Sequence, residues 1–437
     1  MIRNTLETDM AESFDLMNIK LITYLLIFGI VPSLSIYKLE IIYNSFSVEL
    51  FRKIKTTLFS LLLISILLLS FNKFYISFFR EHKPLRYYTN PTYWIYAIGE
   101  YISKTVKRGK LVVKPIGLDA KLMNQNREPK LVIMVVGEAT RADHFSLNGY
   151  ARETNPLLKK EKIINLPHVS SCGTSTAHSV PCMFSIYNRD NYSYKKGIST
   201  ENVLDVLHHT KGIDILWRDN NSNSKGVALR VTYQDYKKSE TNSMCTEGGE
   251  CRDEGMLVGL EAYIAAQKGK DILIVLHQMG NHGPAYYKRY PKAFEKFTPV
   301  CETNQLEECT KEEINNAYDN AILYTDDFLV KTITLLKKYE STHQTAMIYM
   351  SDHGESLGEK GIYLHGLPYF MAPSAQTHIP AIMWLNDSFK DRLNVSTLDT
   401  SKRWSQDNLF HSLLGLFNVE TNVYDAELDI FQSNTKE

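Results

Sequence analysis

The sequence predicts an α/β fold with a doubly wound, mostly parallel sheet flanked by helices and preceded by a helical membrane portion. Three observations predict it. Apolar runs rich in β-branched residues, typical of buried parallel strands, recur after residue 130. Stretches with apolar residues at helical spacing lie between these runs, as expected where strands and helices alternate. Two long apolar blocks occur within the first 80 residues.

The two apolar blocks, about residues 20–37 and 57–72, predict transmembrane helices within a membrane portion of residues 1–80. Each block approaches the roughly 17–25 residues that a spanning helix needs. A pair of buried core helices is the alternative, but the second block carries no charged face. The leader, residues 1–15, is acidic and therefore unlike a cleaved signal. We expect Lys38, Arg52, Lys53 and Lys55 to lie in the loop between the blocks, and these basic residues favour a cytoplasmic loop.

All six cysteines lie in the C-terminal portion of the chain. Sequential pairing is the simplest arrangement, and it joins Cys172 to Cys182, Cys245 to Cys251 and Cys301 to Cys309. Six free thiols or a zinc–thiolate site are the alternatives, although no Cys-x-x-Cys spacing supports the latter. An even number of cysteines in local pairs favours an oxidising compartment. We therefore expect a bacterial inner-membrane protein with its catalytic domain in the periplasm.

The remaining chain is expected to contain a bridge and a catalytic domain. The bridge, residues 81–125, is rich in Tyr and Trp, which is typical of a membrane–water interface or, alternatively, of a packed aromatic loop. Residues 126–437 form the predicted catalytic domain. Its predicted strands are 131–136, 213–217, 272–276, 346–350 and 381–384, and its predicted helices are 203–209, 257–267, 312–338 and 406–416. The 49 basic and 49 acidic residues balance, so nothing indicates nucleic-acid binding.

Polar side chains follow four of the predicted strands. In strand order they are Glu138; Asn221, Ser222 and Lys225; His282; and Asp352, His353, Glu355 and His365. Open α/β sheets place their chemistry at the carboxyl ends of the strands, so we expect these side chains in one crevice. A cluster of two carboxylates and an imidazole suits a divalent metal, zinc above all.

A hydroxyl-rich segment, residues 171–184, offers a nucleophile. Its small hydroxyl residues lead into a predicted helix, and a helix N-terminus favours a phosphate group. A hydroxyl bound to zinc ionises more easily and becomes nucleophilic. The alternative is that a Thr of this segment is only a helix N-cap in a polar turn.

Five motifs together resemble the phosphoethanolamine–lipid A transferases of the alkaline phosphatase-like superfamily, a group that includes the mobile colistin-resistance enzymes. The motifs are VGEATRADHFSLNGY at 136–150, SCGTSTAHSVPC at 171–182, WRDNNS at 217–222, HQMGNHGP at 277–284, and SDHGESLG at 351–358 followed by His365. The resemblance covers essentially the whole chain. It implies an alkaline phosphatase/sulfatase-like fold, and the family's local disulfides agree with the sequential pairing.

The resemblance also implies roles for individual residues. The catalytic zinc would be held by Glu138, Thr176, Asp352 and His353, with Thr176 as the nucleophile. A phosphate group or a second Zn²⁺ would be bound by His282 and His365. The substrate would be contacted by Asn221, Ser222, Lys225 and Glu355, and by Asn4, Thr8 and Glu12 of a periplasmic leader loop.

The implied reaction moves phosphoethanolamine from phosphatidylethanolamine to a phosphate of lipid A through a phosphothreonine, and it would give polymyxin and colistin resistance. The enzyme is expected to be a monomer. The alternatives are another envelope acceptor, a phosphatase- or sulfatase-type hydrolase, or an inactive truncated remnant. The family normally has five spanning helices, whereas this chain has two predicted ones. We therefore expect the chain to begin in the loop before the fourth helix, without the first three.

Overall fold

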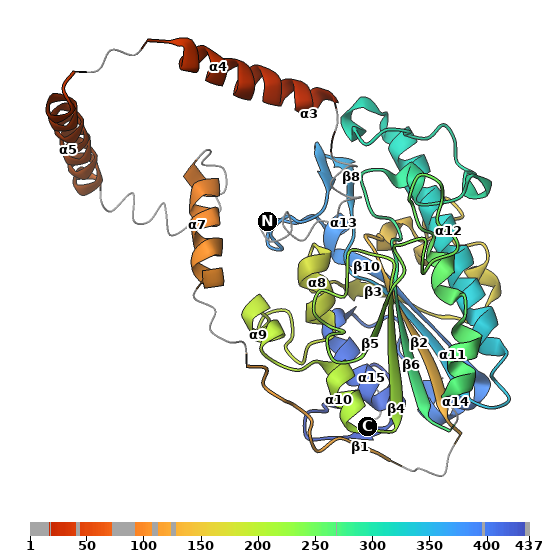
Figure 1. Ribbon diagram of the computed structural model, residues 1–437. Helices are drawn as coiled ribbons and strands as arrows, with labels where there is room; N and C mark the ends of the chain where they lie inside the picture. Colours follow the sequence, from red (N-terminus) through yellow and green to blue (C-terminus); the bar gives the residue numbers. More distant parts are fainter. Residues whose placement is uncertain are drawn as a thin grey trace. The chain divides into compact units, whose positions relative to one another are not determined.

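The computed structural model describes residues 17, 19–40, 44–71, 92–106, 112–123, 128–267, 269–395 and 398–432 (Figure 1). The chain divides into two compact units, one within residues 17–110 and the other from residue 111 onward.

The unit before residue 111 is helical in its described residues. One helix runs without a break through α3 (Ile19–Tyr24), η1 (Leu25–Ile30) and α4 (Val31–Lys38), and the others are α5 (Phe46–Ser70) and α7 (Thr92–Val106). The helices at 19–38 and 46–70 are long and apolar enough to cross a membrane, and neither is buried against protein. The two apolar blocks therefore do not form a pair of buried core helices.

The second apolar helix begins earlier than the sequence predicted. Arg52, Lys53 and Lys55 lie inside α5, so their expected place in a loop is wrong. Glu49 approaches Arg52 to 3.9 Å, an i,i+3 ion pair that favours helix in this polar stretch. Lys and Arg are themselves good helix formers, so the charged stretch continues the apolar helix toward its N-terminus.

The second unit is built on an eight-stranded sheet in the order β11–β3–β10–β7–β2–β6–β4–β5. The strands are β11 (Trp404–Ser405), β3 (Ile164–Ser170), β10 (His378–Leu385), β7 (Gln344–Ser351), β2 (Lys130–Gly137), β6 (Asp271–His277), β4 (Ile213–Asp219) and β5 (Thr232–Asp235). Only β10 runs against its neighbours, so the sheet is mostly parallel, as predicted. Two small antiparallel sheets pair β1 (Lys121–Leu122) with β12 (Val419–Glu420) and β8 (Ser356–Glu359) with β9 (Ile362–Leu364).

Helices cover both faces of the large sheet (Figure 1). One face carries α8 (Thr176–Met183), α10 (Val203–His209), α14 (Asp387–Leu393) and α15 (Leu409–Phe417), and the other carries α11 (Leu260–Ala266) and α12 (Lys311–Lys337). The two apolar cores are separate: Phe184, Trp217 and Phe410 belong to the first, and Phe328 and Tyr349 to the second. Both faces of the central strands are thus buried, which defines a doubly wound α/β fold.

Shorter helices complete the unit. They are α9 (Tyr194–Ile198), α13 (Ser374–Thr377) and the 3-10 turns η3 (Ala142–His144), η4 (Ser146–Asn148), η5 (Leu158–Lys160), η6 (Asp253–Leu257), η7 (Tyr286–Lys288), η8 (Lys292–Phe294), η9 (Leu306–Glu308) and η11 (Gln406–Asn408). The three sequential disulfides are all present, as predicted.

Strand register places the ends of four parallel strands, β7, β2, β6 and β4, side by side. Gly137 of β2 pairs with Ser351 of β7, and His277 of β6 lies opposite both Val136 and Asp219. The residues that immediately follow these strands therefore emerge at one edge of the sheet, although they are far apart in the sequence.

Candidate active site

Four predicted residues meet at the carboxyl edge of the sheet. The Thr176 hydroxyl, in the first turn of α8, donates to Glu138 Oε2 at 3.1 Å and lies 3.4 Å from His353 Nε2. The same imidazole nitrogen is 3.4 Å from Glu138 Oε1 and 3.3 Å from Asp352 Oδ2. All four side chains are buried. The cluster therefore joins a hydroxyl, two carboxylates and an imidazole, as the sequence predicted.

The donor atoms of this cluster fit a divalent cation. Glu138 Oε1 and Asp352 Oδ2 are buried and have no hydrogen-bond donor among the described residues. Together with His353 they offer ligand atoms that all lie within 4.8 Å of one another. Burial, aided by the neighbouring Asp352 carboxylate, raises the pKa of Glu138 well above its usual range. A cation between the carboxylates would offset the cost of burying their charge and would also relieve their mutual repulsion.

The His353 ring is held in the tautomer that a metal ligand requires. Its Nδ1 lies 2.9 Å from the Gly354 carbonyl oxygen, so this nitrogen carries the proton and donates it. The Nε2 lone pair then faces the two carboxylates and Thr176. Burial lowers the pKa of His353, which favours the neutral ring that can bind a cation.

Two further predicted histidines adjoin the cluster. The His365 ring centroid lies 4.3 Å from that of His353 and 6.0 Å from that of His282. His365 Nδ1 is 2.8 Å from Glu355 Oε2, and Tyr286 donates to the other Glu355 oxygen at 2.7 Å. Burial, with a smaller effect of a nearby guanidinium, holds the pKa of His282 well below its usual range. Glu355 is fully buried and orients His365 with this hydrogen bond.

The residues after β4 lie on the other side of Glu138. Asn221 Nδ2 donates to Glu138 Oε2 and to the Gln278 carbonyl oxygen, both at 2.8 Å. The Ser222 hydroxyl donates to Asn221 Oδ1 at 3.0 Å, and Lys225 is buried nearby in the chain. Asn221 therefore holds the Glu138 carboxylate directly. The predicted leader residues Asn4, Thr8 and Glu12 lie outside the described residues.

Backbone conformation after Glu138 is fixed by residues that the sequence analysis missed. Ala139 has φ 53°, which is unfavourable for a residue with a Cβ. The Tyr318 hydroxyl donates to the Ala139 carbonyl oxygen at 2.6 Å, and the Ala139 amide donates to Asp352 Oδ1 at 3.1 Å. These two bonds hold the strained residue between Tyr318 and Asp352. Tyr318 lies on a long amphipathic helix, where nothing in the local sequence distinguishes it from a core residue.

The loop after β6 approaches Glu138 closely. A Cβ on Gly280 would lie 3.0 Å from the Glu138 carbonyl oxygen, and Gly280 has φ 48°, so both space and conformation favour glycine here. The buried Asp253 carboxylate accepts hydrogen bonds from the amides of Met279 (2.8 Å) and Gly280 (3.1 Å). Asp253 thereby shapes the loop that carries His282. It stands in a polar segment whose sequence gives no sign of this role.

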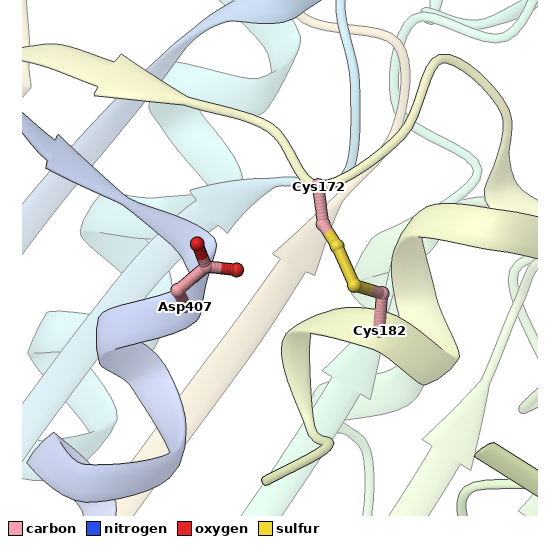
Figure 2. A group of neighbouring side chains, drawn as sticks. All are labelled: Cys172, Cys182 and Asp407. Atoms are coloured by element: carbon pink, nitrogen blue, oxygen red, sulfur yellow. A yellow bond between two sulfur atoms is a disulfide. The ribbon is translucent and has the colours of Figure 1, made fainter. Parts of the chain in front are cut away.

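A second group of neighbouring ligand-type side chains adjoins α8. Figure 2 shows the Cys172–Cys182 disulfide facing Asp407 of the turn before α15. The two sulfurs are bonded to each other, so they are not available as thiolate ligands. The disulfide instead joins Cys172, in the loop before α8, to Cys182 near the end of that helix, so it closes a loop that contains Thr176.

The fold and the cluster define a class: α/β enzymes that carry a buried hydroxyl beside a metal-type donor set at the carboxyl edge of a mostly parallel sheet. A Sulfatase family model matches residues 130–419, and a model of the phosphoethanolamine transferases EptA/EptB matches residues 1–106.

Relatives agree over most of the chain. Phosphatidylethanolamine transferase Mcr-2 of Escherichia coli is 46% identical over 430 residues, which cover 96% of this chain and 79% of the relative. Phosphoethanolamine transferase EptA of Escherichia coli K12 is 42% identical over 443 residues, which cover 99% of this chain and 80% of the relative. The solved integral membrane protein EptA from Neisseria meningitidis is 34% identical with a TM-score of 0.91, covering 100% of this chain and 82% of that one. The chain belongs to the phosphoethanolamine transferases of the EptA/Mcr type.

Proposed function

We propose that this enzyme transfers phosphoethanolamine from phosphatidylethanolamine to a phosphate of lipid A, with Thr176 as the nucleophile and zinc as the cofactor. The observation that carries the proposal is the contact of the buried Thr176 hydroxyl with Glu138 and His353, beside carboxylate oxygens that have no donor within the described parts of the chain. The name of the relative Mcr-2 supports phosphatidylethanolamine as the donor, and the name of EptA supports phosphoethanolamine as the transferred group. The relative named Kdo(2)-lipid A phosphoethanolamine 7''-transferase keeps a core-sugar acceptor as an alternative.

Each residue has a definite part in the proposed reaction. The Thr176 oxygen attacks the donor phosphorus, the phosphorus–oxygen bond to diacylglycerol breaks, and diacylglycerol leaves as the alcohol once its freed oxygen has taken up a proton in balance with the one that Thr176 gives up. The Thr176 proton has an acceptor in place, because Glu138 Oε2 receives its hydrogen bond. In the second half an oxygen of the acceptor phosphate attacks the same phosphorus, the bond to Thr176 breaks, and the free hydroxyl is restored.

The surrounding residues serve the transferred group. Zinc, held by Glu138, Asp352, His353 and Thr176, would lower the pKa of the hydroxyl and offset the charge that develops on the phosphoryl oxygens. The imidazoles of His282 and His365 are proposed to bind the phosphoryl group. Asn221 and Glu355 hold Glu138 and His365 in place, and Ser222 and Lys225 are proposed to contact the substrate.

The membrane helices support a lipid substrate. The helices at 19–38 and 46–70 would anchor the enzyme in the inner membrane, with the disulfide-containing catalytic unit in the periplasm. A hydrolase of a soluble ester would need no such anchor.

Intact mass spectrometry of the purified full chain tests the nucleophile. Incubation with phosphatidylethanolamine and without an acceptor should add one phosphoethanolamine group, which peptide mapping should place on Thr176. Thr176→Ala should abolish the adduct and lower turnover by at least about 10³-fold, because the attacking atom is lost. Thr176→Ser keeps a hydroxyl and should retain part of the activity.

Two outcomes would contradict this proposal. An active enzyme that never carries an adduct would exclude the phosphothreonine route. Equal turnover with and without added lipid A, with water as the acceptor, would instead favour a hydrolase.

A further inference from the structure

A buried glutamine joins the nucleophile segment to the strand that supplies two of the proposed metal ligands. Gln406 is fully buried and begins η11, immediately before Asp407, which Figure 2 shows beside the Cys172–Cys182 disulfide. Its Nε2 donates to the carbonyl oxygens of Ser351 and Asp352, both at 2.8 Å. Its Oε1 accepts from the Cys172 amide at 2.6 Å and from the Ser179 hydroxyl at 2.7 Å.

These four contacts use the whole hydrogen-bonding capacity of a primary amide. Two N–H donors meet two carbonyl oxygens, and one oxygen with two lone pairs receives two donors. The reverse orientation of the amide would place its NH₂ group against the Cys172 N–H and its oxygen against two carbonyls. Only a glutamine side chain of this length satisfies all four partners at once.

The contacts connect the two halves of the candidate active site. Cys172 and Ser179 flank Thr176, one in the preceding loop and the other one turn along α8. Ser351 and Asp352 lie at the end of β7, directly before His353. The Ser179 hydroxyl also lies 2.5 Å from the Asp352 carbonyl oxygen, so its single proton is shared between that oxygen and Gln406 Oε1, and Ser179 links α8 directly to the end of β7.

We propose that Gln406 is a positioning residue that sets the distance between the Thr176 hydroxyl and the cation held by Asp352 and His353. This inference rests on the proposed function of Thr176 and of the metal cluster. Without the amide, α8 could shift relative to the end of β7, and one proposed ligand, Thr176, would move away from the others. Partners that orient metal ligands typically contribute 10–100-fold to metal affinity or activity.

The same short turn contains a matched control residue. Asn408 is also buried, and it bonds to the Leu428 carbonyl oxygen at 2.9 Å and the Ser405 amide at 3.0 Å. Neither partner belongs to the nucleophile segment or to β7. Asn408→Ala therefore removes buried hydrogen bonds from η11 without touching the proposed link.

The test compares Gln406→Met, Ser179→Ala and Asn408→Ala with the wild-type full chain in detergent. Three quantities are measured: zinc affinity by competition with a chromophoric chelator, the rate of adduct formation on Thr176, and the melting temperature of the metal-free form. Gln406→Met should weaken zinc binding and slow adduct formation by about 10–100-fold each. Ser179→Ala should also weaken zinc binding and slow adduct formation, but to a smaller extent. If Gln406→Met does not fold, this second variant still tests the inference.

Asn408→Ala should lower the melting temperature while zinc affinity stays at the wild-type value. Wild-type zinc affinity in both Gln406→Met and Ser179→Ala, or an equal loss in Asn408→Ala, would overturn the inference. A wild-type chain that binds zinc but forms no adduct would contradict the proposed nucleophile alone, because the zinc affinities would still decide the role of Gln406. A wild-type chain without zinc affinity would overturn both.

Discussion

Glu138 and Asp352 place two carboxylates in one buried cluster, with their facing oxygens lacking donors in the described chain. Such an arrangement is unfavourable in the absence of a cation, because burial disfavours each charge and the charges repel one another. The raised pKa of Glu138 expresses that cost. The two buried carboxylates therefore lower the stability of the metal-free protein and at the same time form a site that a metal can fill.

Glu138→Gln should stabilise the metal-free protein at alkaline pH. The pKa of Glu138 is about 4.5 in the unfolded chain and higher in the folded protein. The wild-type protein therefore becomes less stable as the pH rises from the unfolded-state pKa to the folded-state pKa, whereas a glutamine at this position does not titrate. The variant should melt at a higher temperature than the wild type at pH 8, and the difference should shrink toward pH 4.5. Thermal unfolding of the chelator-treated full chain across this range measures it.

The exposed Glu261, paired with Lys338 at the surface, supplies the control. Glu261→Gln should show no comparable gain at pH 8. Zinc should raise the melting temperatures of the wild type and of Glu261→Gln. It should raise the melting temperature of Glu138→Gln much less. A Glu138→Gln variant that is less stable than the wild type at pH 8 without metal would contradict this account.

Much of the site could be predicted from single residues because its members directly follow apolar strands. Glu138, Asp352 and His353 need only the rule that parallel strands end at one edge. Gln406, Tyr318 and Asp253 could not be found in this way. Their roles depend on contacts between segments far apart in the chain, and each stands in a local sequence that reads as ordinary helix, turn or loop.

At the scale of elements, the buried central strands and long helices were predictable, and the sheet margin was not. The predicted helix 312–338 is found as α12, where Thr310 and Glu313 form a capping box. The strand β3 was missed because Pro167 interrupts it and its side chains are only partly buried. The reversed direction of β10 was also not evident, since pairing direction depends on distant connections rather than on local composition.

The start of β2 is tied to the end of α15 by a buried lysine. Lys130 Nζ donates to the Phe417 carbonyl oxygen at 2.8 Å and lies 3.9 Å from Asp271 Oδ2. Lys130→Met keeps the aliphatic volume but removes the donor and the cation, so it should destabilise the catalytic unit by about 3 kcal/mol. Thermal unfolding measures the loss, and zinc affinity should not change because the site lies at the opposite end of β2.

Lys331→Met is the control for this prediction. Lys331 is half-exposed and pairs with Glu254 and Asp327 on the surface of α12, where an ion pair contributes about 0–1 kcal/mol. If Lys130→Met and Lys331→Met had the same melting temperature, the prediction that Lys130 ties β2 to α15 would be wrong.

At the scale of the whole molecule, the proposed product predicts a phenotype. Ethanolamine attached to a lipid A phosphate offsets anionic charge and should weaken the attraction of cationic peptides to the cell surface. Expression of the full chain in a polymyxin-susceptible Gram-negative strain should raise the inhibitory concentration of colistin several-fold. Mass spectrometry of lipid A from the same cells should show added phosphoethanolamine.

The Thr176→Ala chain, expressed at the same level, should change neither the inhibitory concentration nor the lipid. Modified lipid A with an unchanged inhibitory concentration would separate the transfer reaction from resistance. Unmodified lipid A with another envelope component carrying phosphoethanolamine would identify a different acceptor.

The pairing of Gly137 with Ser351 has an evolutionary consequence. Successive residues of a strand point to opposite faces, so one inserted or deleted residue inside β2 or β7 would turn the following carboxylate toward the wrong layer of helices. Natural variation in length should accordingly collect in surface connections and spare these two strands. Homologues in which either strand has gained or lost a single residue would be expected to keep the architecture and lose the chemistry.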